Sequence, residues 1–313
     1  MLILSFYAMT MLAIAGVVVD RLIGEPRTRH PLVGFGTLAV RLEARMNSGF
    51  RARPAGILAW FAAVVPPVAI AWLLVSVLPF ALACIVHVVL LWFALGARSL
   101  RDHIAPIARA LGRGDLDEAR TLTARIVSRE TANADEGALS RAAVESALEN
   151  GNDAIFGALF WFAVAGGPGA LAFRLANTLD AMWGYRTPRY LRFGWAAARF
   201  DDVLNFVPAR LTAASYALLG DTRTAWHCWR TQAPSWDSPN AGPVMASGAG
   251  SLNVLIGGPA VYNGTLESRP VLGAGMAAMP VHVVAALKLV ERSTVLWLAL
   301  LLVGAFISVG AHV

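Results

Sequence analysis

The sequence predicts an all-α, polytopic membrane protein with a helical cytoplasmic insert. Its 313 residues are 57% hydrophobic and only 15% charged, and the mean hydropathy is +0.58. A soluble domain usually carries about a quarter charged residues, so this composition is typical of a chain embedded in a lipid bilayer. Several apolar stretches are long enough to cross that bilayer, and no segment shows the alternation of a half-buried strand.

The clearest candidate spans are uninterrupted apolar stretches. A transmembrane helix needs about 20 mostly apolar residues, and four stretches approach that length: 2–19, 55–77, 78–95 and 294–311. The second and third form a hairpin that Pro79 breaks, and Pro66-Pro67 should kink the second. The first stretch is expected to remain as a membrane span and not to be cleaved as a signal peptide, because no basic residue precedes it.

Three weaker candidates are apolar but interrupted: 154–171, 203–219 and 271–290. The first contains a Gly-Gly-Pro-Gly run, the second contains Arg210, and the third contains His282 and Lys288. Each could be a span, a re-entrant segment or a helix buried against the others.

Basic residues predict the orientation. The net charge is +6, and Lys288 is the only lysine. The arginines concentrate in 20–55, 98–141 and 172–202, which the positive-inside rule places in the cytoplasm. The N-terminus is then outside, and 154–171 has to be re-entrant or lie along the membrane, because a single crossing would put the next segment outside.

The segment 98–150 is expected to be a soluble helical insert within one integral membrane domain, 1–313. Asp115 can cap a helix that starts at Leu116. A second helix is predicted over 140–150 and leads back to the membrane.

Composition also excludes some classes of protein. The arginines are scattered, and no array of base-stacking aromatic residues accompanies them. The basic excess therefore indicates anionic lipid headgroups and not nucleic acid. Cys84 and Cys228 have neither the number nor the spacing of a disulfide framework or a zinc site, and we expect two buried small hydrophobes.

Polar residues beside apolar sequence indicate candidate sites, because they are costly there without a partner or a function. Arg141, Glu145, Glu149 and Asp153 are spaced by four and share one helix face. Such a row is either a salt-bridged surface or a set of carboxylates that holds Mg²⁺ with a nucleotide. Because the row runs into an apolar segment, neither interpretation is favoured.

Two further clusters follow along the chain. One contains Arg174, Asn177 and Asp180, followed by Gly184, Tyr185 and Arg186; the other contains Arg199, Asp201, Asp202, Asn205 and Arg210. The aspartates and Asn205 can supply oxygen ligands, and the arginines can hold phosphate through paired hydrogen bonds. The alternative is that Asp201 or Asp202 caps a helix opening at Val203.

Turn-forming segments carry the remaining polar candidates. Segments 238–242, 257–259 and 262–264 are rich in Gly, Pro and Asn, which is typical of loops, although backbone amides in such loops can bind phosphate. His30 precedes a proline just after the first span, where a turn residue is the more common interpretation. No GxxxxGK[ST] motif is present, so a nucleotide site would need arginines, backbone amides and carboxylate-held Mg²⁺.

The order and the residues of these clusters resemble those of the CbiB/CobD family of cobalamin biosynthesis proteins. The resemblance rests on DRLIGEP with HP at 20–31, ESALENGNDA at 145–154, the long block at 169–213, SPNAG at 238–242, GGPAVYNG at 257–264 and RPVLG at 269–273. The resemblance implies a ligase of the cell inner membrane, with a cytoplasmic active face. It would use ATP and Mg²⁺ to join adenosylcobyric acid to aminopropanol or its O-phosphate, giving adenosylcobinamide or its phosphate.

Under this resemblance the site residues take three roles. The candidates for Mg²⁺ binding or general-base catalysis are Glu145, Glu149, Asp153, Asp201 and Asp202, with the metal assigned to the first three. The candidates for substrate binding are His30, Asn177, Asp180, Tyr185, Arg186, Arg199, Asn205, Arg210 and Asn240. Other membrane enzymes of the corrinoid pathway are expected partners. The rival function is a corrinoid transporter or a non-catalytic membrane subunit of the same pathway, in which the buried charges line a path.

Overall fold

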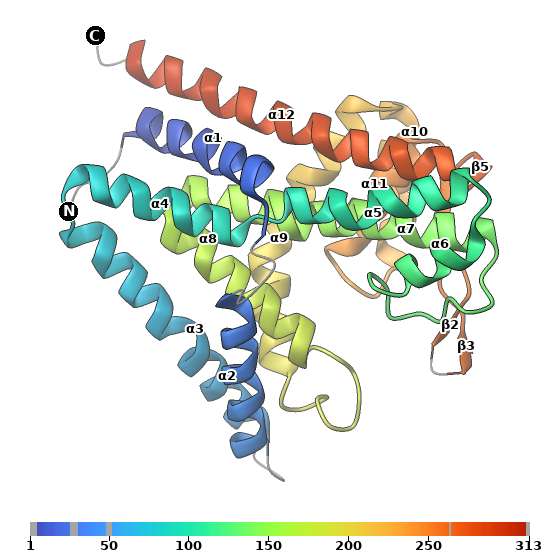
Figure 1. Ribbon diagram of the computed structural model, residues 1–313, viewed down its shortest axis with the longest axis horizontal. Coiled ribbons are helices and arrows are strands. Elements are labelled where there is room, and N and C mark those ends of the chain that lie inside the picture. The colour runs from blue at the N-terminus through green and yellow to red at the C-terminus, as the bar shows by residue number, and fades with distance from the viewer. Residues whose placement is uncertain (1–4, 26–30, 48–51, 263, 311–313) are drawn as a thin grey trace. The chain divides into compact units, whose positions relative to one another are not determined.

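The computed structural model describes residues 5–25, 31–47, 52–262 and 264–310 (Figure 1). The chain divides into two compact units. Unit 1 comprises Met1–Gly96, Gly157–Asn205 and Leu300–Val313, and unit 2 comprises Ala97–Phe156 and Phe206–Ala299. The prediction of one integral membrane domain stays a prediction.

The chain is helical throughout its long elements and is a multi-pass membrane protein. Five helical segments are long and apolar enough to cross a bilayer: Phe6–Ile23, Ala52–Val77, Phe80–Gly112, Glu136–Trp183 and Pro280–Ser308. The four clear stretches fall within or overlap these segments, and 154–171 falls within the fourth of them. The weaker stretch 203–219 lies in a helix that is not among them.

Unit 1 is built from apolar helices. It contains α1 (Phe6–Ile23), α2 (Pro31–Met46), α3 (Ala52–Val77), α4 (Phe80–Ala94), α8 (Gly157–Trp183) and the first part of α9 (Trp195–Leu219). Helix α4 packs along α8, with α1 and α3 also against this pair (Figure 1). Its core is rich in alanine, such as Ala59, Ala63 and Ala176, which are fully buried and let helix backbones approach closely.

Helix α8 is kinked where the glycine run interrupts the apolar stretch. Ala165 and Gly166 leave helical geometry, and Gly166 has a φ of 63°. A Cβ atom on Gly166 would lie 2.5 Å from Cε1 of His87. The backbone N–H of Gly167 donates to Nδ1 of His87 at 2.9 Å, so an α4 side chain satisfies a donor that the kink releases. The predicted interruption is confirmed, and the re-entrant path stays a prediction.

A buried carboxylate in unit 1 should make stability depend on acid pH. Glu43 on α2 accepts hydrogen bonds from Arg189 Nε at 3.0 Å and Nη2 at 2.6 Å. The Arg189 guanidinium holds the pKa of Glu43 below its ordinary value of 4.5, although burial opposes this. A carboxyl whose pKa is lowered by folding stabilises the folded state above its unfolded pKa, and this contribution is lost as pH falls through the folded pKa.

We expect Arg189→Gln to lower the melting temperature of the detergent-purified protein at pH 7, with the deficit shrinking as the pH falls below 4.5. Arg192→Gln, at an exposed neighbouring arginine, is the control and should follow the wild type at every pH. A constant deficit for Arg189→Gln from pH 7 down to acid pH would contradict the linkage to Glu43.

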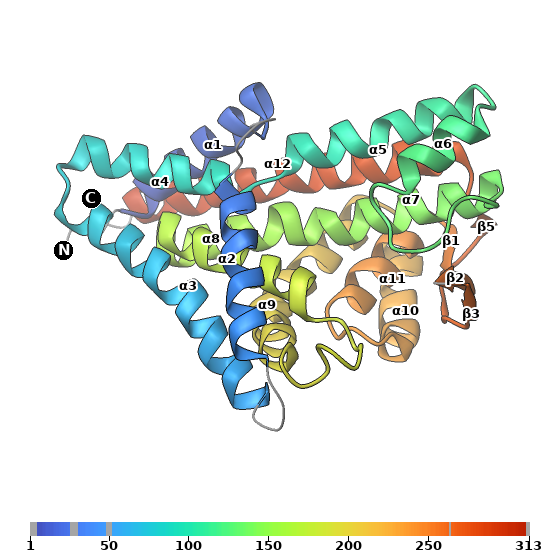
Figure 2. The same ribbon diagram turned by 60° about the horizontal axis from the view of Figure 1, so that its bottom comes forward.

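Unit 2 combines helices with short strands. It contains α5 (Ala97–Gly112), α6 (Leu116–Thr123), α7 (Glu136–Gly151), the π-helix η2 (Asn152–Phe156), α10 (Thr222–Gln232), the 3-10 helix η3 (Ala233–Ser235), α11 (Ala241–Ser251) and most of α12 (Pro280–Gly310). The predicted cap of α6 is confirmed, since the Asp115 carboxylate accepts from the backbone N–H of Glu118. The predicted second insert helix corresponds to α7, and α10 packs against α11 (Figure 2).

The predicted all-α class holds for the long elements, but unit 2 also contains short strands that the sequence did not predict. The structure has β1 (Val254–Gly257), β2 (Ala260–Tyr262), β3 (Thr265–Glu267), β4 (Val271–Gly273) and β5 (Met276–Ala277). β1 lies between antiparallel β4 and parallel β5, and β2 pairs with β3 in an antiparallel hairpin. Strands of two to four residues are too short to show an alternation pattern. The weak candidate span 271–290 is therefore β4, β5 and the start of α12.

Candidate functional site

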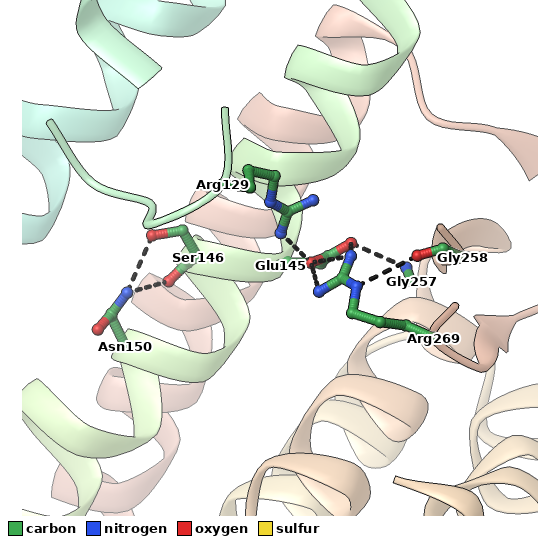
Figure 3. Close-up of polar contacts among 7 residues, drawn as sticks. All are labelled: Arg129, Glu145, Ser146, Asn150, Gly257, Gly258 and Arg269. Atoms are coloured by element: carbon green, nitrogen blue, oxygen red, sulfur yellow. Dashed lines mark hydrogen bonds and ion pairs between the residues drawn. The ribbon is translucent and has the colours of Figure 1, made fainter. Parts of the chain in front are cut away.

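A carboxylate–arginine cluster in unit 2, formed by Glu145, Arg129, Arg269 and the backbone amide of Gly257, is the candidate site (Figure 3). Glu145 on α7 is 3% exposed. Its carboxylate forms an ion pair with Arg129, accepts from Arg269 at 3.2 Å, and accepts from the Gly257 N–H at 2.8 Å. Both arginine side chains are also largely buried, so the cluster is a desolvated, charge-assisted network.

Loops from distant parts of the chain bring the donors to Glu145. Arg129 comes from the loop between α6 and α7, and Arg269 from the loop between β3 and β4 (Figure 3). Gly257 ends β1 with a φ of 73°, and a Cβ atom there would lie 2.2 Å from the Pro270 carbonyl oxygen. Only glycine allows this approach of two loops. Arg269 Nε also donates to the Gly258 carbonyl at 3.2 Å, which fixes the guanidinium.

Glu149 and Asp153 follow Glu145 along the chain and continue the predicted row of acidic residues. Glu149 lies one turn after Glu145 on α7, and it interacts electrostatically with Asp153, Glu145, Arg129 and Arg269. The helix changes to π geometry directly afterwards, at Asn152–Phe156. Single π turns inside α-helices are frequent at functional sites. The row of Glu145, Glu149 and Asp153 is therefore not a simple salt-bridged surface, and its carboxylates do not lie on one face of a regular α-helix.

The π turn is held by a short hydrogen-bond chain. Asn152 Nδ2 donates to Asp153 Oδ1 at 2.9 Å, and Thr212 Oγ1 donates to Asn152 Oδ1 at 2.9 Å. Asn152 is 2% exposed. These contacts set the direction of the Asp153 carboxylate, which a sequence spacing of four does not determine once the helix widens.

The carboxylates fit Mg²⁺ only together with ligands from a substrate. Within the described ranges, no group of three or more His, Cys, Asp or Glu side chains could hold a metal ion. Glu145 already accepts from three donor groups. Mg²⁺ usually takes one or two carboxylates plus substrate phosphates, so Glu149 and Asp153 are the chemically suitable members of the predicted Glu145, Glu149 and Asp153 set. The metal assignment stays a prediction.

A second polar cluster lies in unit 1 around Asp201. Asn177 Nδ2 donates to one Asp201 carboxylate oxygen at 3.2 Å, and Asn205 Nδ2 donates to the other at 3.3 Å. The structure thus joins Asn177 of one predicted cluster to Asp201 and Asn205 of the other, which the sequence did not predict. Asp202 pairs instead with Arg199 at 3.2 Å. Burial raises the pKa of the Asp202 carboxyl, while Arg199 and Arg186 oppose that shift.

The interpretation of these aspartates as helix caps is wrong. Helix α9 begins at Trp195, so Asp201 and Asp202 lie two turns inside it. Trp195–Phe200 extends the helix upstream of the apolar residues from which a start at Val203 was inferred. Asp201 and Asp202 do differ in environment, as adjacent helix positions pointing about 100° apart should.

Three other predicted binding residues lie in or near the turn after α8. Asp180 accepts a hydrogen bond from the Gly184 N–H through its backbone carbonyl at 2.7 Å, and a Cβ atom on Gly184 would lie 2.0 Å from Asp180 Oδ1. Tyr185 is 55% exposed, and Arg186 acts electrostatically on Asp202. His30 lies outside the described residues.

Arg210 and Asn240 contact each other in unit 2. Arg210 Nη1 donates to Asn240 Oδ1 at 2.6 Å, and Nη2 donates to the Pro239 carbonyl at 2.9 Å. The guanidinium also stacks on the Phe206 ring at 3.7 Å. This contact joins segment 238–242 to Arg210, the last residue of the polar cluster at 199–210.

Sequence reasoning missed the donors to Glu145. Arg129 and Arg269 were not among the predicted site residues, and Gly257 was predicted only as part of a loop that binds phosphate. Arg129 and Arg269 lie 16 and 124 residues from Glu145 in the sequence, so no local spacing pattern links them to it. The available signal was indirect: a buried carboxylate on α7 has to be neutralised, and Arg269 lies in one of the resembling motifs, although Arg129 does not.

Comparisons with known proteins agree on one family. The family model described as CobD/Cbib protein matches residues 13–290. The chain is 56% identical to the cobalamin biosynthesis protein CobD of Stutzerimonas stutzeri over 296 residues, covering 94% of this chain and 97% of that relative. It is 51% identical to the protein of that name from Chromobacterium violaceum, with 94% and 96% covered, and 38% identical to the one from Rhodobacter capsulatus, with 93% and 94% covered. No solved structure matches.

Proposed function

Since this chain belongs to the CobD/CbiB family of cobalamin biosynthesis proteins, we propose that it is an amide-forming ligase. The proposed reaction joins adenosylcobyric acid to aminopropanol or aminopropanol phosphate and consumes ATP. One observation supports it most: the fixed Glu145 cluster holds two arginines one helical turn from Glu149, with Asp153 following in the π turn. Arginines and carboxylates in one desolvated site are the groups that phosphoryl transfer and amine attack require.

In the proposed chemistry, the substrate carboxylate first attacks the terminal phosphorus of ATP. An acyl phosphate forms and ADP leaves. The amine nitrogen then attacks the acyl carbon, inorganic phosphate departs, and the amine proton passes to a base. When bound, Mg²⁺ would screen the charge of the phosphates.

The residues divide these tasks by their geometry. We assign Arg129 and Arg269 to phosphate charge, because Glu145 fixes both guanidinium groups in place. Glu145 is thus a positioning residue in this proposal. Glu149 is the proposed base, because its carboxylate interacts electrostatically with the Glu145 cluster but takes no part in the ion pairs of that cluster. Asp153 is the proposed second carboxylate for the metal and phosphate.

The experiment is amide synthesis by the purified full chain, with ATP, Mg²⁺, adenosylcobyric acid and aminopropanol phosphate and no other protein. We expect adenosylcobinamide phosphate, and one phosphate released for each amide formed. The rival transporter function predicts no product but ATP-independent movement of corrinoid into proteoliposomes. The absence of amide with either amine, from folded protein, would overturn the ligase proposal.

We propose an inner-membrane location with the active face in the cytoplasm, which yields a topology prediction. In a background lacking Cys84 and Cys228, single cysteines replacing Ala44 and Ala132 should resist a membrane-impermeant thiol reagent in intact cells. Both positions are exposed on the folded chain, so only the membrane would protect them. A cysteine replacing Leu78, at the α3–α4 turn, should react. Labelling of Ala44→Cys or Ala132→Cys in intact cells would reverse the orientation.

A further inference from the structure

A cavity of about 470 Å³ lies in unit 2, and Trp236 in its wall faces Arg269, which pairs with Glu145. Its walls come from α9, α10, η3 and the first turn of α11, and the residues that line it include Arg210, Trp229, Arg230, Trp236, Asp237 and Pro239. Small-molecule sites usually have volumes of about 300–1,000 Å³. The volume thus suits a nucleotide or a smaller phosphate ester.

The cavity is built from stiff parts. Pro234, Pro239 and Pro243 line it, and proline fixes its own backbone angle. Gly242 lets α11 approach η3, because a Cβ atom there would lie 2.6 Å from the Ala233 carbonyl oxygen. Ser238 Oγ accepts from the Ala241 N–H at 3.1 Å, which closes the loop that carries Pro239. The walls are therefore formed before any ligand arrives.

Arg210 is fixed at the edge of this cavity with hydrogen-bonding capacity left over. Its guanidinium donates to Asn240 Oδ1, the Phe206 carbonyl and the Pro239 carbonyl. An arginine has five N–H donors, so these contacts leave two within the described part of the chain. The contacts come from both sides of the guanidinium and hold it in one orientation, which lowers the entropy cost of binding an anion.

Arg230 and the tryptophans complete the cavity. Arg230 forms no hydrogen bond or ion pair with the residues that the structure describes, and its side chain is exposed. Two arginines against one acid, Asp237, make the lining net positive by one charge. Trp229 and Trp236 add flat apolar faces, and Arg269 lies 5.4 Å from the Trp236 ring. Positive charge beside aromatic faces is the combination that binds phosphate esters carrying a ring.

We propose that this cavity binds a phosphate-bearing substrate, with the phosphate on Arg210 and Arg230. The inference rests on the proposed ligase function for the choice of ligands, which are ATP and aminopropanol phosphate. The two share the phosphate and differ in the rest of the molecule. ATP brings a base that can stack on Trp236, whereas aminopropanol phosphate brings an ammonium group that can pair with Asp237.

The test is equilibrium binding of radiolabelled ATP and of aminopropanol phosphate to the full chain in detergent, with inorganic phosphate as competitor. We expect Arg230→Gln to weaken binding of one or both ligands about tenfold, since it removes a charge-assisted hydrogen bond. Arg223→Gln, at an exposed arginine of the same helix that does not line the cavity, should bind as the wild type does. Because Arg230 has no partner in the described chain, its replacement should not disturb folding.

Two further variants distinguish the ligands. If ATP occupies the cavity, Trp236→Ala should weaken ATP binding at least tenfold, Trp236→Phe should restore most of it, and Asp237→Asn should strengthen it. If aminopropanol phosphate occupies it, Asp237→Asn should weaken binding of that ligand and Trp236→Ala should have little effect. Either pattern supports the proposal.

Wild-type affinity for both ligands in Arg230→Gln and in Arg210→Lys would overturn the proposal, and so would an equal loss in Arg223→Gln. The proposed function fails separately. If phosphate binding depends on Arg230 but no amide is formed, the cavity proposal stands and the ligase proposal is overturned. If amide is formed but ligand binding does not depend on Arg230, only the cavity proposal is overturned.

Discussion

Glu145→Gln should lower the free energy of unfolding by about 3 kcal/mol or more, because removing one partner of a buried ion pair leaves the other charge uncompensated. Here two charges are left, since Arg129 and Arg269 both pair with Glu145 and are both largely buried. Glutamine keeps the size of the side chain but presents an amide to the guanidinium groups. Chemical denaturation of the detergent-purified protein, followed by tryptophan fluorescence, measures the change.

The matched control is Glu118→Gln, which removes a carboxylate from an arginine pair on the surface. Glu118 pairs with Arg113, and both side chains are about half exposed, at 45% and 58%. Exposed pairs contribute about 0–1 kcal/mol, so this variant should unfold nearly as the wild type does. High salt should also weaken the Glu118 contribution more than the Glu145 one. Equal stability of the two variants would mean that the Glu145 cluster is solvated and not buried.

Glu149→Gln should abolish most amide synthesis, with kcat reduced about 10²–10⁴-fold, which is the range for loss of a general base. The protein should still insert, accumulate and unfold at close to wild-type denaturant concentration. The physical reason is that Asp153 and Glu145 both repel the Glu149 carboxylate, so neutralising it relieves repulsion inside the site. Steady-state kinetics on purified protein, with membrane insertion checked in parallel, makes the measurement.

Glu136→Gln provides the control for Glu149→Gln. Glu136 is an exposed carboxylate in the first turn of the same helix, α7, so its replacement removes one charge from the element without touching the cluster. It should retain wild-type turnover. Near-normal turnover in Glu149→Gln itself would remove Glu149 from the proposed mechanism and leave the acidic row as a structural feature.

The sequence alone was sufficient for features that depend on local pattern. Apolar stretches of bilayer length predicted four of the candidate spans, and the glycine run predicted the interruption that appears at Ala165 and Gly166. Asp115 was identified as the cap of α6 because a cap acts on amides three residues away. The motifs that resemble the family were also read directly from the chain, and the family is confirmed.

Prediction from local sequence pattern failed where an element is very short, or where a helix begins before the apolar residues that indicated it. The strands of two to four residues between 254 and 277 have no detectable period, so they were missed. The start of α9 at Trp195 displaced Asp201 and Asp202 from cap positions to the helix interior. The π turn at Asn152 changed the face on which Asp153 lies, although a spacing of four from Glu149 implied a straight row.

Tertiary structure alone decided which charges meet. The sequence predicted Glu145 and Glu149 as equivalent members of one row, but the fold neutralises Glu145 with Arg129 and Arg269 and leaves Glu149 beside that pair. It likewise joined Arg210 to Asn240, 30 residues further along the chain. Secondary structure follows from interactions between residues a few positions apart, whereas neutralising a buried charge depends on which loops pack against it, and that is decided only when the whole unit has folded.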